Sequence, residues 1–118
     1  MAQQGSTKFL FLRRRDKSKR GSDASFSINE VGLQAKKIEV DNEGSIEHEV
    51  NDFHPTHVVI ESIWVNPERF AILTHIYPHI MWIIRVMPEA AAIVRDGMGK
   101  EWLLEYVKYK NVFVKLCT

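Results

Sequence analysis

A chain of 118 residues with 45% hydrophobic and 26% charged residues has the size and composition of one globular domain. We therefore expect a single domain over residues 1–118, with residues 1–7 as a flexible N-terminal tail. The net charge of +1 argues against binding nucleic acid through overall charge, and the single cysteine excludes an internal disulfide. The apolar runs are too short to cross a membrane, and no signal peptide is evident, so we expect neither a membrane protein nor a secreted one.

The first predicted element is a buried strand at Lys8–Arg13, with the sequence KFLFLR. The apolar run ends at a highly charged segment, since residues 13–20 hold six cations and one aspartate. A short, weakly patterned helix is predicted at Ser22–Val31, and a second strand at Leu33–Val40.

The second half of the chain alternates helices and strands more clearly. Asn66 followed by Pro67 is a typical helix start, since the asparagine caps the helix and the proline suits its first turn. In chain order, the remaining predicted elements are a helix at Ser45–Phe53, a strand at Thr56–Ser62, a helix at Pro67–Tyr77, a strand at Ile80–Val86, a helix at Lys100–Tyr109 and a strand at Asn111–Cys117.

The predicted strands are continuous apolar runs and do not alternate apolar with polar residues. Such runs are typical of strands that are buried on both faces, and their alternation with helices indicates parallel pairing through crossover connections. The sequence therefore predicts an α/β domain whose mostly parallel five-stranded sheet is covered by helices on both faces.

Three places in this predicted sheet are candidates for a binding site, because open parallel sheets bind ligands beyond the carboxyl ends of their strands. They are the basic loop that begins at Arg13, Arg14 and Arg15, the loop from Glu61 to Trp64, and the segment that begins at Arg85. The basic loop is either a solvated surface or a contact for an anion or a partner.

Glu61 has three readings: a general acid or base, a hydrogen-bonded or ion-paired structural residue, or an exposed strand end. An ion pair with Arg85 is the favoured reading if the two strands that carry these residues are neighbours, since no second carboxylate at a suitable spacing supports catalysis. The three tryptophans are expected to pack in or around the core, and Trp64 is the best candidate among them for a surface contact.

The sequence contains none of the common catalytic or cofactor-binding motifs. The glycine-rich loops of dinucleotide-binding and P-loop proteins are absent, as is the GxSxG of the hydrolases. His54 and His57 form an HxxH pair, but Pro55 and the predicted strand start at Thr56 separate them, and His75 and His79 flank a Tyr-Pro turn. We therefore expect loop and helix-end roles for the five histidines and no metal site. No cofactor and no catalytic residue are predicted.

The segments HPTHVVIESIWVNPERFAIL, HIYPHIMWIIRV and EWLLEYVKYKNVFV resemble the N-terminal, Rossmann-like half of bacteriophage-encoded glycosyltransferase-like proteins. The resemblance covers about Lys8 to Val114 and implies a Rossmann-like three-layer sandwich. It carries over Glu61, Trp64 and Arg85 as framework or cleft residues. It also implies a location in the host cytoplasm or the virion.

Departures from that family limit what the resemblance implies about activity. Its members typically follow the fourth strand with a His-Ser pair, where this chain has Met87 and Pro88, and they bind the sugar donor mainly through a second domain. The favoured hypothesis is thus a non-catalytic binding or virion assembly module with a protein partner, a phage structural protein or a second copy of itself. The alternative is the nucleotide-sugar-binding half of a glycosyltransferase that another chain completes.

Overall fold

The computed structural model describes residues 7–15, 34–86 and 98–116. The helix predicted at Ser22–Val31, the basic residues 16–20, the segment that follows Val86 and all but the last residue of the predicted tail lie outside the described residues. The described strands are β1 (Lys8–Arg14), β2 (Gln34–Val40), β3 (His57–Glu61), β4 (Met81–Val86) and β5 (Val112–Leu116).

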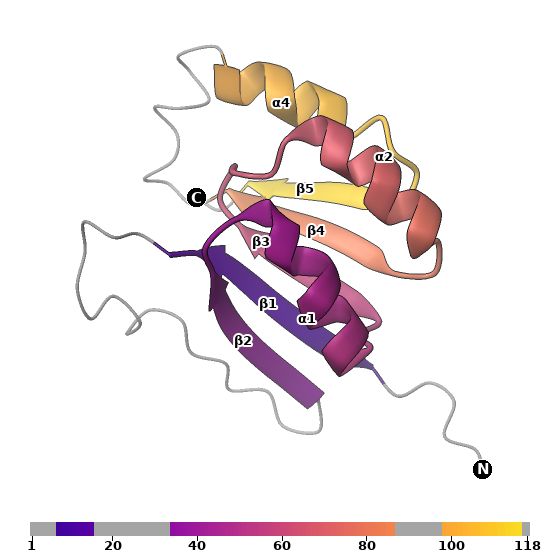
Figure 1. Cartoon of the computed structure of the whole chain (residues 1–118). Coiled ribbons are helices and arrows are strands. Elements are labelled where there is room, and N and C mark those ends of the chain that lie inside the picture. Colours follow the sequence, from indigo (N-terminus) through magenta and orange to yellow (C-terminus); the bar gives the residue numbers. More distant parts are fainter. Residues whose placement is uncertain (1–6, 16–33, 87–97, 117–118) are drawn as a thin grey trace.

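The strands form one five-stranded sheet in the order β2-β1-β3-β4-β5, and every neighbouring pair is parallel. Figure 1 shows this sheet as a twisted layer with β2 and β5 at its two edges. The predicted α/β class with a five-stranded, Rossmann-like parallel sheet is confirmed, and each strand lies within about two residues of its predicted bounds.

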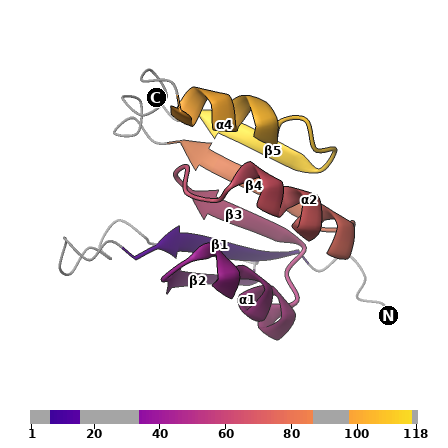
Figure 2. The same cartoon turned by 45° about the horizontal axis from the view of Figure 1, so that its top comes forward.

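The described helices are a 3₁₀ turn η2 (Glu43–Ser45), α1 (Ile46–Phe53), α2 (Pro67–Ile76) and α4 (Met98–Tyr106). In both Figure 1 and Figure 2 the three α-helices lie on the same side of the sheet. Right-handed connections require this arrangement, because β2 to β3, β3 to β4 and β4 to β5 all advance across the sheet in one direction.

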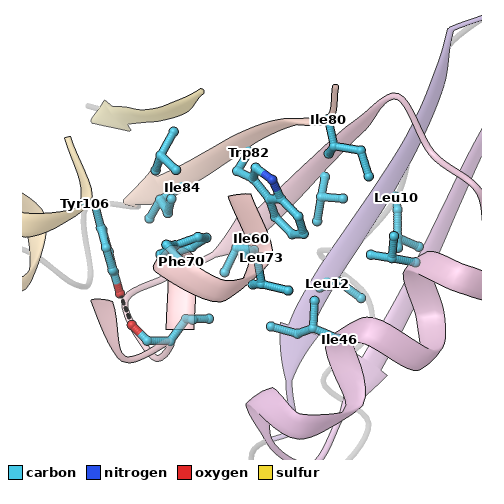
Figure 3. Close-up of a cluster of buried hydrophobic side chains, with 14 of the residues drawn as sticks. Leu10, Leu12, Ile46, Ile60, Phe70, Leu73, Ile80, Trp82, Ile84 and Tyr106 are labelled. Carbon is cyan, nitrogen blue, oxygen red and sulfur yellow. Dashed lines mark hydrogen bonds between the residues drawn. The ribbon is translucent and has the colours of Figure 1, made fainter. Parts of the chain in front are cut away.

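The main core lies between this helical layer and the sheet. Alternate residues along the strands point toward the helices, and the strand residues buried there include Leu10 and Leu12 of β1, Val58 and Ile60 of β3, and Trp82 and Ile84 of β4, each 0% exposed. The helices supply Ile46 and Val50 from α1, Phe70 and Leu73 from α2, and Tyr106 from α4. Figure 3 shows these side chains meeting between the two layers.

An aromatic cluster joins α2 and α4 to the centre of the sheet. The Phe70 ring meets the Tyr106 ring edge-to-face at 5.1 Å between centroids, and it meets Trp82 in the same way at 6.0 Å. The hydroxyl of Tyr106 donates to the carbonyl of Val65 at 2.5 Å, the bond drawn as a dashed line in Figure 3. This bond fixes the loop that enters α2 against the last described helix.

Helix starts follow the predicted capping chemistry at α2 and depart from it at α1. Asn66 accepts from the backbone N–H of Glu68 at 2.9 Å, as its position before Pro67 predicts. The helix predicted from Ser45 instead begins at Ile46, because residues 43–45 form a 3₁₀ turn capped by the side chain of Asn42.

The last predicted helix is displaced toward the N-terminus: α4 covers Met98–Tyr106, whereas Lys100–Tyr109 was expected. Successive turns take over after Tyr106, with Lys108 donating to the carbonyl of Glu105 and Tyr109 to that of Tyr106. The chain thereby reverses in time to enter β5 at Val112.

Candidate functional site

The carboxyl ends of all five strands meet along one margin of the sheet. The strand order reverses between β1 and β3, because the connection from β1 leads to β2 on one side while β3 lies on the other. In open α/β sheets such a reversal opens a crevice in which ligands bind. Arg13 at the end of β1 and Glu61 at the end of β3 are in register at this point.

Charged residues occupy one register position in every strand at this margin. From one edge of the sheet to the other, they are Glu39, Arg13, Glu61, Arg85 and Lys115. We call these five residues the charged row. Residues in register on neighbouring parallel strands point to the same face of the sheet, so the row lies on the face opposite α1, α2 and α4.

Two ion pairs link members of the charged row. Arg85 Nη1 lies 2.8 Å from Glu61 Oε2, and Arg13 Nη2 lies 2.8 Å from Glu39 Oε2. The predicted pair of Glu61 and Arg85 is therefore confirmed, and its geometric condition is met because β3 and β4 are neighbours. Arg13 pairs across the other neighbouring strand, a contact that the sequence did not indicate.

Glu61 is the most enclosed carboxylate of the row, with 13% of its side chain exposed. Burial raises the pKa of the Glu61 carboxyl above its ordinary value, and the positive charges of Arg85 and Arg13 offset this effect only in part. The raised pKa makes this carboxyl easier to protonate than that of an exposed glutamate. Its short contact with Arg85, however, ties it to a structural partner.

The three arginines proposed as contact residues point to different surroundings. Arg13 belongs to the charged row, and Arg14 is exposed at the end of β1. Arg15 reaches over the end of β2, where its Nε lies 3.5 Å from Asp41 and 4.0 Å from Glu39. Its backbone N–H donates to the carbonyl of Val40, which holds the start of this loop against β2.

The loop after β3 turns back over the core. Ser62 has a φ of 78°, a left-handed conformation that is uncommon outside glycine, and its N–H donates to the carbonyl of Arg85 at 2.8 Å. The sequence did not single out Ser62, because serine is not a residue type that indicates a positive φ. Strained backbone at the carboxyl end of a central strand is a recurrent feature of functional sites.

Trp64 does not present its ring to solvent as a surface contact would require. Only 8% of the residue is exposed, it belongs to the core cluster, and its Nε1 donates to the carbonyl of Glu61 at 2.8 Å. The tight turn at Ser62 reverses the chain, so a tryptophan that follows a strand end in the sequence returns to the core. Trp64 therefore packs in the core, as expected for the tryptophans in general, and is not the surface contact for which it was the best candidate.

The described histidines take local structural positions. His57 stacks on Phe9 at 4.6 Å between ring centroids, and His54 ends α1 in a left-handed conformation. Among residues 7–15, 34–86 and 98–116, no three His, Cys, Asp or Glu side chains are grouped so that they could hold a metal ion. In the same part of the chain, no helix is long and apolar enough to span a membrane.

The margin thus brings together five of the six predicted contact residues and adds others that sequence reasoning did not single out. Arg13, Arg14, Arg15, Glu61 and Arg85 lie at the carboxyl ends of β1, β3 and β4. Glu39, Asp41, Ser62 and Lys115 join them. Glu39, Asp41 and Lys115 are charged residues near predicted strand ends, so counting from each strand end would have found them. Comparison of the chain with protein-family models, curated proteins and solved structures finds no match.

Proposed function

We propose that this domain is a non-catalytic binding module that uses a Rossmann-like scaffold to engage a protein partner. The observation that carries the proposal is the pairing of carboxylates at the margin where such folds place their chemistry. Among the described residues there, Glu39, Asp41 and Glu61 each lie within 4.0 Å of an arginine. A general acid or base must reach a substrate proton, and a carboxylate held by a guanidinium is poorly placed for that.

Exposed apolar side chains support a protein as the partner. In the described part of the chain, six large hydrophobic residues are between 40% and 56% exposed: Ile72, Ile76, Met81, Leu104, Val107 and Phe113. Apolar and aromatic side chains of this kind are enriched at the centres of protein interfaces.

The resemblance to phage glycosyltransferase-like proteins extends this proposal to a setting. A phage chain that uses this scaffold for binding and not for sugar transfer would serve as an assembly or host-interaction component. Its place would be the host cytoplasm or the virion. If so, the protein is found in purified phage particles, and charge reversal at Arg13, Arg14 and Arg15 lowers its incorporation. Absence from the particles would refute the virion role.

A second candidate function is nucleotide-sugar binding by half of a glycosyltransferase. The observation in its favour is the position of Arg13 and Arg85 on either side of Glu61, beside the reversal in strand order. Diphosphates bind to guanidinium groups, and in the flavodoxin-like strand order 2-1-3-4-5 the ligand site lies between the first and third strands.

Calorimetry separates the two candidates. The protein is titrated with a panel of uridine and guanosine diphosphate sugars, with Arg85→Ala as the site variant and Lys108→Ala as a control whose ammonium lies far along the chain, beside Glu105. The binding module predicts no saturable heat with any member of the panel. Saturable heat that Arg85→Ala abolishes and Lys108→Ala leaves unchanged would overturn the proposal and establish the nucleotide-sugar site.

A further inference from the structure

The exposed apolar residues are unevenly distributed over the fold. Four of the six lie at the β5 end of the sheet: Met81 on β4, Leu104 on α4, Val107 directly after α4, and Phe113 on β5. Ile72 and Ile76 on α2 are the other two. Figure 2 shows α4 as the outermost helix at this end, lying over β5. An edge strand and the helix that covers it therefore both carry exposed apolar side chains.

The two edges of the sheet differ in how they are protected. β2 carries the adjacent lysines Lys36 and Lys37 near its middle, and lysines on an edge strand oppose pairing with another chain. β5 reads Val-Phe-Val-Lys-Leu, with its one charge near the end and a phenylalanine that is 45% exposed. β2 therefore carries two cations near its middle, of which Lys36 pairs with Asp52 of α1, whereas β5 carries one cation near its end.

The backbone of β5 offers hydrogen-bonding groups on its outer side. Trp82 N–H donates to the carbonyl of Asn111, so the groups of residues 111, 113 and 115 face β4 and those of Val114 and Leu116 face away from it. Among the described residues no strand pairs with that outer side, because β5 ends the sheet. A strand of another chain could use these groups without disturbing the pairing with β4.

We infer that the protein partner is a second copy of this chain, bound by antiparallel pairing of β5 with β5 of that copy. This inference rests on the proposed binding function and names its partner. Centring the two-fold axis on Val114 places the outward groups of Val114 opposite their equivalents. It also sets Phe113 opposite Lys115 of the second copy, so an aromatic ring meets an ammonium group and the two equivalent lysines stay apart.

The same axis explains the apolar surface of α4. A two-fold axis perpendicular to the sheet keeps both helical layers on one side and brings α4 beside α4 of the second copy. Val107 N–H donates to the carbonyl of Leu103, so the helical turn continues past Tyr106, and Leu104 and Val107, three residues apart, share a face. The two-fold axis would bring this apolar turn of one α4 towards its equivalent in the second copy.

The test measures the mass of the full chain across the micromolar to millimolar range by sedimentation and light scattering. Phe113→Lys is paired with the control Ile76→Lys, which places the same charge at a residue of similar exposure, 49%, on α2. We expect a dimer whose dissociation constant rises about tenfold or more in Phe113→Lys and is unchanged in Ile76→Lys. Circular dichroism checks that both variants are folded as the wild type is.

A second variant addresses the backbone directly. Val114→Pro removes an N–H that faces outward and none that bonds to β4, so the sheet keeps its pairing while the dimer loses symmetric hydrogen bonds. In the wild type, hydrogen exchange at Val114 should slow as protein concentration rises, and in Phe113→Lys this dependence should disappear.

Two results would overturn the inference: a wild type that stays monomeric throughout the range, or a dimer that Ile76→Lys weakens as much as Phe113→Lys does. A monomer would leave the proposed binding function standing, because calorimetry tests that proposal separately and overturns it by saturable nucleotide-sugar binding. The two failures are therefore distinguishable.

Discussion

Replacing Tyr106 with phenylalanine isolates the hydrogen bond that joins α4 to the loop before α2. The ring is 0% exposed, and its hydroxyl is 2.5 Å from the carbonyl of Val65, which is itself a buried residue. Phenylalanine keeps the edge-to-face contact with Phe70 and removes only the donor. An unsatisfied buried carbonyl costs about 1–3 kcal/mol, so we expect Tyr106→Phe to lower the free energy of unfolding by about 1.5 kcal/mol.

Urea unfolding followed by circular dichroism measures this loss, with an unchanged dependence on denaturant concentration as evidence that the folded state stays compact. Tyr77→Phe is the matched control, because the Tyr77 hydroxyl donates to Asn51 at 2.7 Å in an exposed setting. Water replaces that bond, so the control should cost no more than about 0.5 kcal/mol. Equal losses in the two variants would show that burial of the Tyr106 bond does not set its contribution.

Three further predictions concern charge, pH and backbone conformation. A double-mutant cycle of Glu61→Ala and Arg85→Ala should give a coupling free energy of about 0.5–1.5 kcal/mol at neutral pH. This is less than for a fully buried pair, because the Arg85 side chain is 33% exposed. Because burial raises the pKa of Glu61, the coupling should be lost at a higher pH than for an exposed glutamate, and a coupling that stays constant down to strong acid would contradict the assignment. Burial also raises the pKa of the Tyr106 hydroxyl, so the stabilising effect of this hydroxyl is complete below pH ~10 and is lost as the pH rises above that value. In chemical denaturation across this range, the free energy of unfolding should decline more steeply for the wild type than for Tyr106→Phe. His54→Gly should raise the free energy of unfolding by about 0.5 kcal/mol, since glycine adopts the φ of 56° at the end of α1 without strain. The greater conformational freedom of glycine in the unfolded chain offsets only part of this gain. A variant that is destabilised in thermal melts would contradict the prediction.

The sequence predicted the strands well because burial on both faces leaves a strong local signal. Val58, Val59 and Ile60 have no polar neighbour between them, and all three are buried in β3. The start of α2 was equally predictable, because Asn66 and Pro67 act through local backbone chemistry. Bounds were less accurate at α4, where the helix ends through successive turns that carry no glycine or proline.

The site was predictable only where it depends on position along a strand. Glu61 and Arg85 were found because each ends an apolar run, and their pairing required only that the two strands be neighbours. Trp64 was singled out among the tryptophans as the best candidate for a surface contact because it follows a strand, and no local rule shows that Ser62 would reverse the chain with a positive φ. Register across strands was also hidden from the sequence, so Glu39 was not recognised as a partner of Arg13.

The charged row itself gives a reason for the observed strand order. Reading across the sheet, Glu39, Arg13 and Glu61 alternate in sign, and this alternation needs β1 between β2 and β3. Placing β2 directly beside β3 would set two carboxylates against each other at a partly buried margin, where repulsion is poorly screened. The row thus opposes one misassembled sheet that the apolar strands alone would accept, since their hydrophobic surfaces carry little information about order.

The alternation fails at one place, and that place is the edge where we propose dimerisation. Arg85 on β4 and Lys115 on β5 are in register and carry the same charge. Lys115 is exposed, so water screens this repulsion in the monomer. In the proposed dimer Lys115 gains the Phe113 ring of the second copy, which favours a cation on its face. Arg85 and Lys115 are therefore the only like-charged neighbours in the row, and dimerisation would give Lys115 a favourable partner in place of this repulsion. Lys115→Glu should strengthen the interaction with Arg85 and weaken self-association, as measured by sedimentation. A variant that dimerises as tightly as the wild type would refute this coupling.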